Sequence, residues 1–140
     1  MRAVVQRVSG ARVQPGGAIG PGLVVLVGIA RGDDGAAAAA LAGRVARLRL
    51  FEGADGRFRR SLLDTGGAAL VVSQFTLVAS HRGTRPDFSA AARPEQAEPL
   101  YERFVAALRE LGVPTKTGVF GASMALELIN DGPVTVVLDG

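Results

Sequence analysis

The stretch Ala-Leu-Val-Val-Ser-Gln-Phe-Thr-Leu, residues 69–77, joins an apolar strand pattern to a polar turn. Its first half is short, apolar and rich in β-branched residues, which is typical of a strand buried inside a sheet. The apolar pattern stops at Ser73 and Gln74, so a hydroxyl, an amide and free backbone donors would lie where the strand ends. A core has no use for these groups, and the stretch therefore predicts one wall of a pocket.

A second stretch, Asn-Asp-Gly-Pro-Val-Thr at residues 130–135, places a Gly-Pro step inside a run that otherwise resembles one continuous strand. Proline at Pro133 can donate no hydrogen bond to a strand ladder. From the residues alone, Gly132-Pro133 is a strand breaker with a trans peptide, because only about 5–6% of X-Pro bonds in folded proteins are cis. The two stretches together predict a pocket lined by backbone groups.

The remaining patterns predict an α/β (α+β) fold with a mixed sheet and two main helices. The first helix is indicated by apolar residues at helical spacing after Asp34, which can cap it. The second helix ends at Gly112. Between them, a hairpin with Phe58 and Leu62 facing inward is expected. The expected strands are 2–14, 18–30, 68–77, 115–120, 125–130 and 134–138, the helices 36–50 and 95–111, the hairpin 51–63, and the long surface loop 81–94.

Length and composition bound the possible functions. At 140 residues with 48% hydrophobic residues, we expect one domain over residues 1–140. The chain has no cysteine and one histidine, which excludes disulfides and leaves too few ligands for a zinc site; we expect no metal and no cofactor. The N-terminus shows no leader, and no apolar run approaches the roughly 18 residues of a membrane span. We therefore expect a cytoplasmic protein with no membrane partner.

The net charge of +3 and the pI near 10.5 suit a polyanionic partner such as RNA, because arginines neutralise phosphates. A merely solvated basic surface accounts for the same charge equally well. Charge alone leaves both interpretations open.

The hydroxyls of Ser73 and Thr76 are possible nucleophiles at a strand end, but such a nucleophile needs a base. The only histidine, His81, lies in the expected surface loop, and nothing in the sequence places it beside either hydroxyl. The hydroxyls could instead satisfy backbone groups at the strand end, or face a substrate without covalent attack. Residues 121–125 lack the last glycine of a G-x-S-x-G elbow, and Met124 is by default a core residue.

Four segments carry a family resemblance: residues 1–8, 73–77, 117–122 and 130–135. Together they resemble the D-aminoacyl-tRNA deacylases, the D-tyrosyl-tRNA deacylase family, and the likeness runs nearly end to end. The resemblance implies a largely antiparallel, barrel-like sheet and a homodimer that binds the aminoacylated 3′ end of tRNA in the cytoplasm. It also implies hydrolysis of the ester of D-aminoacyl-tRNA, and of glycyl-tRNA mischarged on tRNA-Ala.

In that family the Gly-Pro step is cis and enters the active site of the dimer partner, so the resemblance implies this role for Gly132 and Pro133. Two parallel carbonyls would then exclude L-aminoacyl groups, whose Cβ would collide with them, while D-aminoacyl groups and glycine fit. Arg7 matches the family residue that braces the motif. From the residues alone, it could be an ordinary exposed strand arginine.

The resemblance gives the first stretch a catalytic role. Backbone N–H groups of Phe75 and Thr76 would stabilise the oxyanion, Gln74 would orient the terminal nucleotide or the water, and Ser73 would support the strand end. The 2′-hydroxyl of the tRNA would help to activate the water. Phe88 would form a wall of the adenosine pocket, with Met124 close to it.

Arginines 82, 85 and 93 of the expected loop are candidates for contact with the acceptor stem, or serve solubility alone. Two rival functions remain open. One is a non-catalytic RNA-binding module, and the other is an esterase that uses Ser73 or Thr76 with His81.

Overall fold

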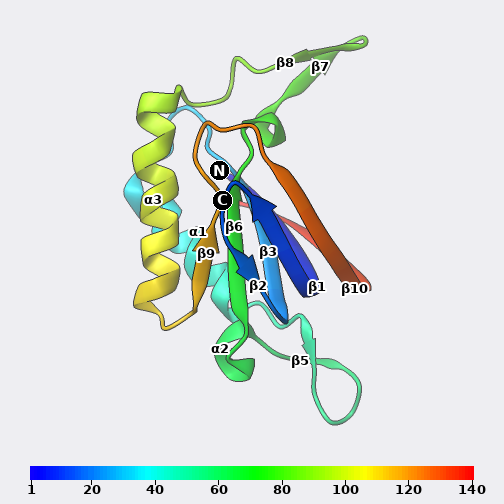
Figure 1. Cartoon of the computed structure of the whole chain (residues 1–140). Coiled ribbons are helices and arrows are strands. Elements are labelled where there is room, and N and C mark those ends of the chain that lie inside the picture. The colour runs from blue at the N-terminus through cyan, green and yellow to red at the C-terminus, as the bar shows by residue number, and fades with distance from the viewer.

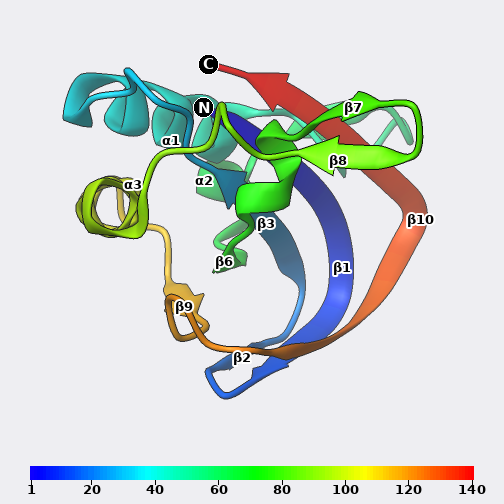
Figure 2. The same cartoon turned by 90° about the horizontal axis from the view of Figure 1, so that it is seen from above.

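Strands β3 (Gly22–Gly28) and β6 (Ala68–Ser73) run parallel at the centre of the main sheet (Figure 1). The sheet has six strands in the order β10-β1-β3-β6-β9, with β2 paired to β1. β1 is antiparallel to β2, β3 and β10, whereas β9 is parallel to β6. Seen from above, the sheet curves into an open barrel (Figure 2). The other strands of this sheet are β1 (Arg2–Gln14), β2 (Ala18–Ile19), β9 (Thr115–Thr117) and β10 (Ala125–Asp139).

The central strands are apolar on both faces because each face meets its own cluster. Alternate residues of β6, such as Ala69 and Val71, join the larger cluster under the helices, while Leu70 and Val72 join a smaller cluster within the curve of the sheet. This two-sided burial explains the uninterrupted apolar run. The fold is the mixed α/β single domain with a barrel-like sheet that the sequence predicted.

Helices α1 (Gly35–Arg47) and α3 (Pro94–Glu110) cover the outer face of the sheet (Figure 2). The carboxylate of Asp34 accepts a hydrogen bond from Ala37 N at 2.8 Å, so the predicted cap is confirmed. Both predicted helices are confirmed, with ends shifted by one to three residues. None of the helices combines the length and the apolar composition that a membrane-spanning helix needs.

The predicted hairpin at 51–63 is correct only in part. It contains β4 (Phe51–Glu52) and β5 (Phe58–Arg60), but Leu62 is buried in a short helix, α2 (Leu62–Thr65), instead of a strand. Ser61 and Asp64 form a capping box that starts α2, a sequence signal that was missed. The inward prediction for Phe58 is wrong, because its side chain is 53% exposed.

Two further predictions need correction. The central strand ends at Ser73 and not at residue 77, since a 3-10 helix, η1 (Phe75–Val78), follows it. The expected loop 81–94 contains a projecting hairpin of β7 (Ser80–Arg82) and β8 (Arg85–Asp87) (Figure 1).

The expected strand 18–30 is divided at Gly20-Pro21 into β2 and β3. Gly22 then begins β3 where a Cβ would collide with the backbone of Ala68.

The C-terminal strands 125–130 and 134–138 are one strand, β10, so the Gly-Pro step does not break it. The ladder with β1 shifts register there: Gln6 pairs with Thr135, but Val8 pairs with Asn130. Residues 131–134 consequently have no partner on β1, and this bulge accommodates a proline that cannot donate. The Gly132–Pro133 peptide is cis, as is Gln14–Pro15.

Candidate active site

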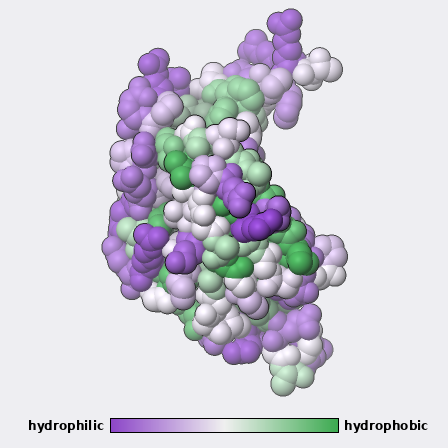
Figure 3. Space-filling view, in the orientation of Figure 1, coloured by the Kyte–Doolittle hydropathy of each residue, from purple (hydrophilic) through white to green (hydrophobic).

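A cavity of about 730 Å³ opens at the carboxyl ends of β3 and β6 and includes Phe88, the residue after β8, in its lining. In Figure 3, hydrophobic surface lies below the mostly hydrophilic projecting arm. Six residues that the sequence singled out line this cavity, and so do the phenylalanine at 120 and the arginine at 31. The six are Ser73, Gln74, Phe75, Phe88, Arg93 and Met124.

The turn after β6 is fixed by backbone hydrogen bonds. Gln74 N donates to Val27 O at 2.8 Å, and Leu77 N donates to Gln74 O at 3.2 Å. A Cβ at Gly28 would lie 3.0 Å from both Gln74 O and the Leu77 Cβ, so glycine lets the turn pack closely on the end of β3.

The backbone N–H groups of Phe75 and Thr76 donate none of the backbone hydrogen bonds found in the turns, loops and caps. They are the first two amides of η1, and neither has a helical partner. The Thr76 hydroxyl accepts a hydrogen bond from the side-chain amide of Gln74, and Thr76 does not line the cavity. Two unsatisfied amides beside a cavity can stabilise a developing negative charge.

Aromatic rings form one wall of the cavity. Phe75 and Phe88 meet edge to face with centroids 5.2 Å apart, and they remain 56% and 38% exposed. Phe120 also lines the cavity and packs against the buried Tyr101, with ring centroids 5.8 Å apart. No role for Phe120 was predicted from the sequence, although this residue falls within the segment 117–122 that carries the family resemblance. Such a wall suits a planar ligand.

His81 lies on the exposed β7, makes no hydrogen bond to Ser73 or Thr76, and does not line the cavity. The cavity contains no carboxylate and no histidine; its charged members are the arginines at 31 and 93. An arrangement of nucleophile and base, as an esterase requires, is therefore absent from this geometry.

A second group of residues surrounds Gly132 and Pro133. Arg7 is only 7% exposed, so the interpretation of an ordinary surface arginine is wrong. Its Nε donates to Asp131 O at 3.1 Å, and its Nη1 donates to Leu50 O at 2.8 Å. Gly132 has φ = 127°, a conformation that favours glycine.

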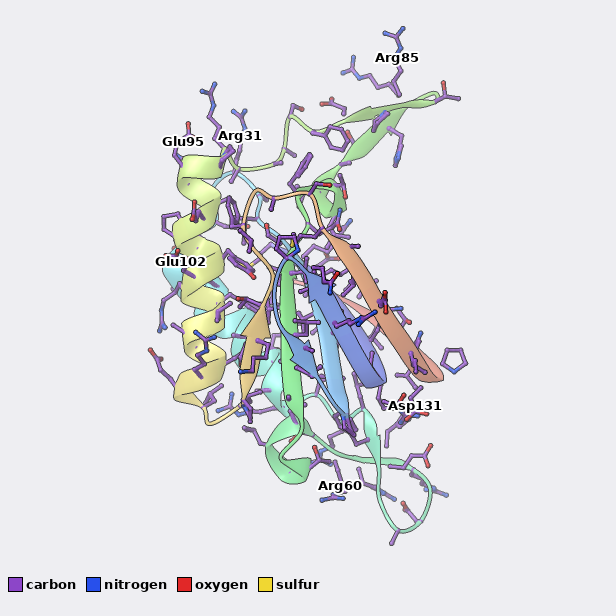
Figure 4. The ribbon with its side chains drawn as sticks, in the orientation of Figure 1. Arg31, Arg60, Arg85, Glu95, Glu102 and Asp131 are labelled. Carbon is purple, nitrogen blue, oxygen red and sulfur yellow. The ribbon has the colours of Figure 1, made fainter.

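The two groups lie at opposite ends of the sheet. Arg7 pairs with Leu23 at the start of β3, whereas the cavity opens beyond the end of β3. In Figure 4 Asp131 and Arg31 are correspondingly far apart, near the bottom and the top of the molecule. The prediction that the two stretches line one pocket is therefore wrong for a single chain.

A barrel-like α/β domain with free amides beside an aromatic cavity defines a protein that can bind a planar group and stabilise an oxyanion. The family model of D-Tyr-tRNA(Tyr) deacylase matches residues 4–139. The chain belongs to this family, which confirms both the resemblance and the predicted enzyme class, a deacylating hydrolase.

Similar proteins span the whole chain. D-aminoacyl-tRNA deacylases of Dinoroseobacter shibae and Thermus aquaticus are 58% and 57% identical, over 100% and 99% of this chain and 100% and 95% of theirs. Among solved structures, the c-Myc DNA Unwinding Element Binding Protein is 39% identical, with a TM-score of 0.92 over 100% of this chain and 99% of that one. A probable eukaryotic D-amino acid tRNA deacylase shares the fold, with a TM-score of 0.85, 18% identity, and coverage of 98% and 97%.

Proposed function

We propose that this enzyme hydrolyses the ester between a D-amino acid and the 3′-terminal adenosine of tRNA, releasing free amino acid and tRNA. The observation that carries the proposal is a pair of unsatisfied amides, one at Phe75, which lines the aromatic cavity, and one at the adjacent Thr76. The names of relatives that match over the full chain support the substrate. Because aminoacyl-tRNA is made and used in the cytoplasm, we place the enzyme there.

The mechanism needs little from side chains because an ester is already activated. Water adds to the ester carbonyl, and the backbone N–H groups of Phe75 and Thr76 stabilise the resulting oxyanion. The C–O bond to the ribose then breaks, and the 3′-oxygen takes a proton. The tRNA 2′-hydroxyl assists the water, which accounts for a cavity without carboxylate or histidine.

The adenine lies against the aromatic wall, where Phe88 and Phe75 offer faces and edges to a planar base. Gln74 orients the terminal nucleotide or the water, and Ser73 supports the end of β6. Met124 shapes the floor, where it packs over Gly118 without room for a Cβ between them.

Chiral selection comes from a second copy of the chain. In a homodimer, Gly132 and Pro133 of one subunit enter the partner's cavity, and their carbonyls exclude the Cβ of an L-aminoacyl group. Arg7 positions this loop through Asp131 O. Glycine has no Cβ, so glycyl-tRNA mischarged on tRNA-Ala is also a substrate.

The same assay tests the activity and its selectivity. Of three matched substrates, D-aminoacyl-tRNA should be hydrolysed fast and L-aminoacyl-tRNA not at all. Glycyl-tRNA should be hydrolysed at a measurable rate. Gly132→Ala should raise L-aminoacyl-tRNA hydrolysis relative to D, because a Cβ there would lie 2.8 Å from Val134 Cγ2 and 3.1 Å from the Arg7 guanidinium. An unchanged D-to-L ratio in a folded Gly132→Ala dimer would contradict the chiral role.

A non-catalytic nucleic-acid-binding function is the second candidate, favoured by the basic pI and by the name of the similar DNA-binding protein. It predicts retention of intact D-aminoacyl-tRNA with no release of amino acid. An esterase with His81 as base predicts instead that His81→Ala abolishes turnover. Our proposal predicts substantial turnover in both His81→Ala and Thr76→Ala, because neither side chain performs the chemistry.

A further inference from the structure

The β4–β5 hairpin is an exposed basic arm at the end of the molecule opposite the cavity (Figure 1). Arg57, Arg59 and Arg60 are all exposed, and Phe58 among them is half exposed. Asp55 neutralises Arg59 through a 3.0 Å ion pair. Arg60 donates to the backbone oxygen of Asp64, and its charge also acts on the Asp64 carboxylate, but neither Arg60 nor Arg57 forms an ion pair. Two exposed cations of this arm therefore lack an ion-paired carboxylate.

The hairpin is joined to the Gly-Pro loop through Arg7. The Arg7 guanidinium lies 5.7 Å from the centre of the Phe58 ring and also donates to Asp131 O. Arg60 and Asp131 line the same hollow of about 430 Å³, and Figure 4 shows both at the lower end of the molecule. If residues 131–133 dock on another subunit, the β4–β5 arm is therefore brought to that subunit with them.

From this linkage we infer that the β4–β5 arm of one subunit binds backbone phosphates of the tRNA acceptor stem whose 3′ end occupies the partner's cavity. The inference rests on the proposed function, in which Gly132 and Pro133 enter that cavity. The arm then reaches the rim where the partner's own β7–β8 hairpin projects. A stem leaving the cavity passes between two basic hairpins, one from each subunit, although within one chain the hairpins lie at opposite ends (Figure 1).

The direct test removes the two cations that lack a paired carboxylate. For Arg57→Ala combined with Arg60→Ala, we expect KM for D-aminoacyl-tRNA to rise about tenfold with kcat unchanged. The slope of log KM against log salt should fall by about 1.5, since each phosphate contact contributes roughly 0.7 to 0.9. Hydrolysis of a 3′-D-aminoacyl-adenosine, which has no phosphates, should not change. An unchanged KM and salt slope would overturn the inference.

The control is Arg44→Ala combined with Arg47→Ala, which removes the same charge from the exposed surface of α1. It should leave KM and the salt slope near their wild-type values. An equal rise in the control would mean that net charge, and not the arm, attracts the RNA. Thermal unfolding at one protomer concentration identifies any variant that lost its fold.

Mixed dimers test which subunit supplies the arm. The first subunit carries Arg57→Ala and Arg60→Ala and keeps an open cavity. The second subunit keeps an intact arm, and Ala122→Trp fills its cavity. Wild-type KM in this mixed dimer is expected, since the open cavity is served by the intact arm of its partner. A KM that stays raised would place the arm on its own subunit's substrate and overturn the inference. The D-to-L ratio of Gly132→Ala separately reports whether the proposed function itself fails.

Discussion

Replacing Arg7 should destabilise the fold more than replacing any exposed arginine of β1. Arg7 is buried and makes charge-assisted hydrogen bonds to two backbone oxygens, at Asp131 and Leu50. Bonds to charged groups contribute about 1.5 to 3 kcal/mol each. Its ion pairs with Glu52 and the Asp131 carboxylate, at 3.9 and 3.5 Å, add little because both carboxylates are more than half exposed.

For Arg7→Met, which keeps the apolar stem and loses both donors, we expect a loss of about 3 kcal/mol in the free energy of unfolding. A chain of 140 residues unfolds with an entropy of roughly 0.3 kcal/mol/K. The melting temperature should therefore fall by about 10 °C. Arg7→Lys should lose less, because one ammonium can still reach one of the two oxygens.

Urea and thermal unfolding at a fixed protomer concentration measure the loss, and D- against L-aminoacyl-tRNA hydrolysis measures the expected relaxation of selectivity. The matched control is Arg12→Met on the same strand. Arg12 is exposed and forms an ion pair with Glu127. The hydrogen bond that Arg12 donates to Glu127 raises the pKa of the Arg12 guanidinium and lowers the pKa of the Glu127 carboxyl. That variant should unfold close to wild type. Equal midpoints for Arg7→Met and wild type would refute the reasoning.

Three further changes test the cavity and its support. Gly28→Ala should lower kcat with a smaller effect on KM in single-turnover and steady-state assays, because its Cβ would push on Gln74 O and Leu77 and displace the two amides. Phe88→Ala should raise KM for D-aminoacyl-adenosine several-fold with little change in the melting temperature, since Phe88 is partly exposed. Burial raises the pKa of Tyr101 to about 12, so the folded protein holds the Tyr101 phenol proton more tightly than the unfolded chain does. The free energy of unfolding should be unaffected below pH 10, then fall as the pH rises from 10 to 12, and fall less in Tyr101→Phe.

The sequence predicted what depends on local pattern and on two-sided burial. The run at 69–72 is buried on both faces, and the apolar spacing of both helices matches their packed sides. The prediction for Phe58 failed because alternation in a short strand does not say which face is covered. At that site the ring meets the guanidinium of Arg7, and no core element packs over it.

Site residues that are close in sequence, or placed by the resemblance, could be assigned to one cavity: Gln74, Phe75, Phe88 and Met124 all line it. The position of Gly132 could not be predicted from local pattern. It depends on the register of β10 with β1, which a bulge shifts just opposite Arg7, and on the antiparallel course of β1 beside β3. Register of this kind is a property of the whole sheet.

The surroundings of Gly132 have a consequence for how the site is assembled. A buried arginine at position 7 is costly to place in a fold, and the positive φ at Gly132 restricts that position to glycine; neither residue supports the cavity of its own chain. Arg7 instead holds one loop and the basic β4–β5 arm together. This arrangement serves a function when the Gly132–Pro133 loop and the β4–β5 arm together contact another copy of the chain. The proposed exchange between subunits supplies that use, and it requires loop, Arg7 and arm to be tested as one coupled element.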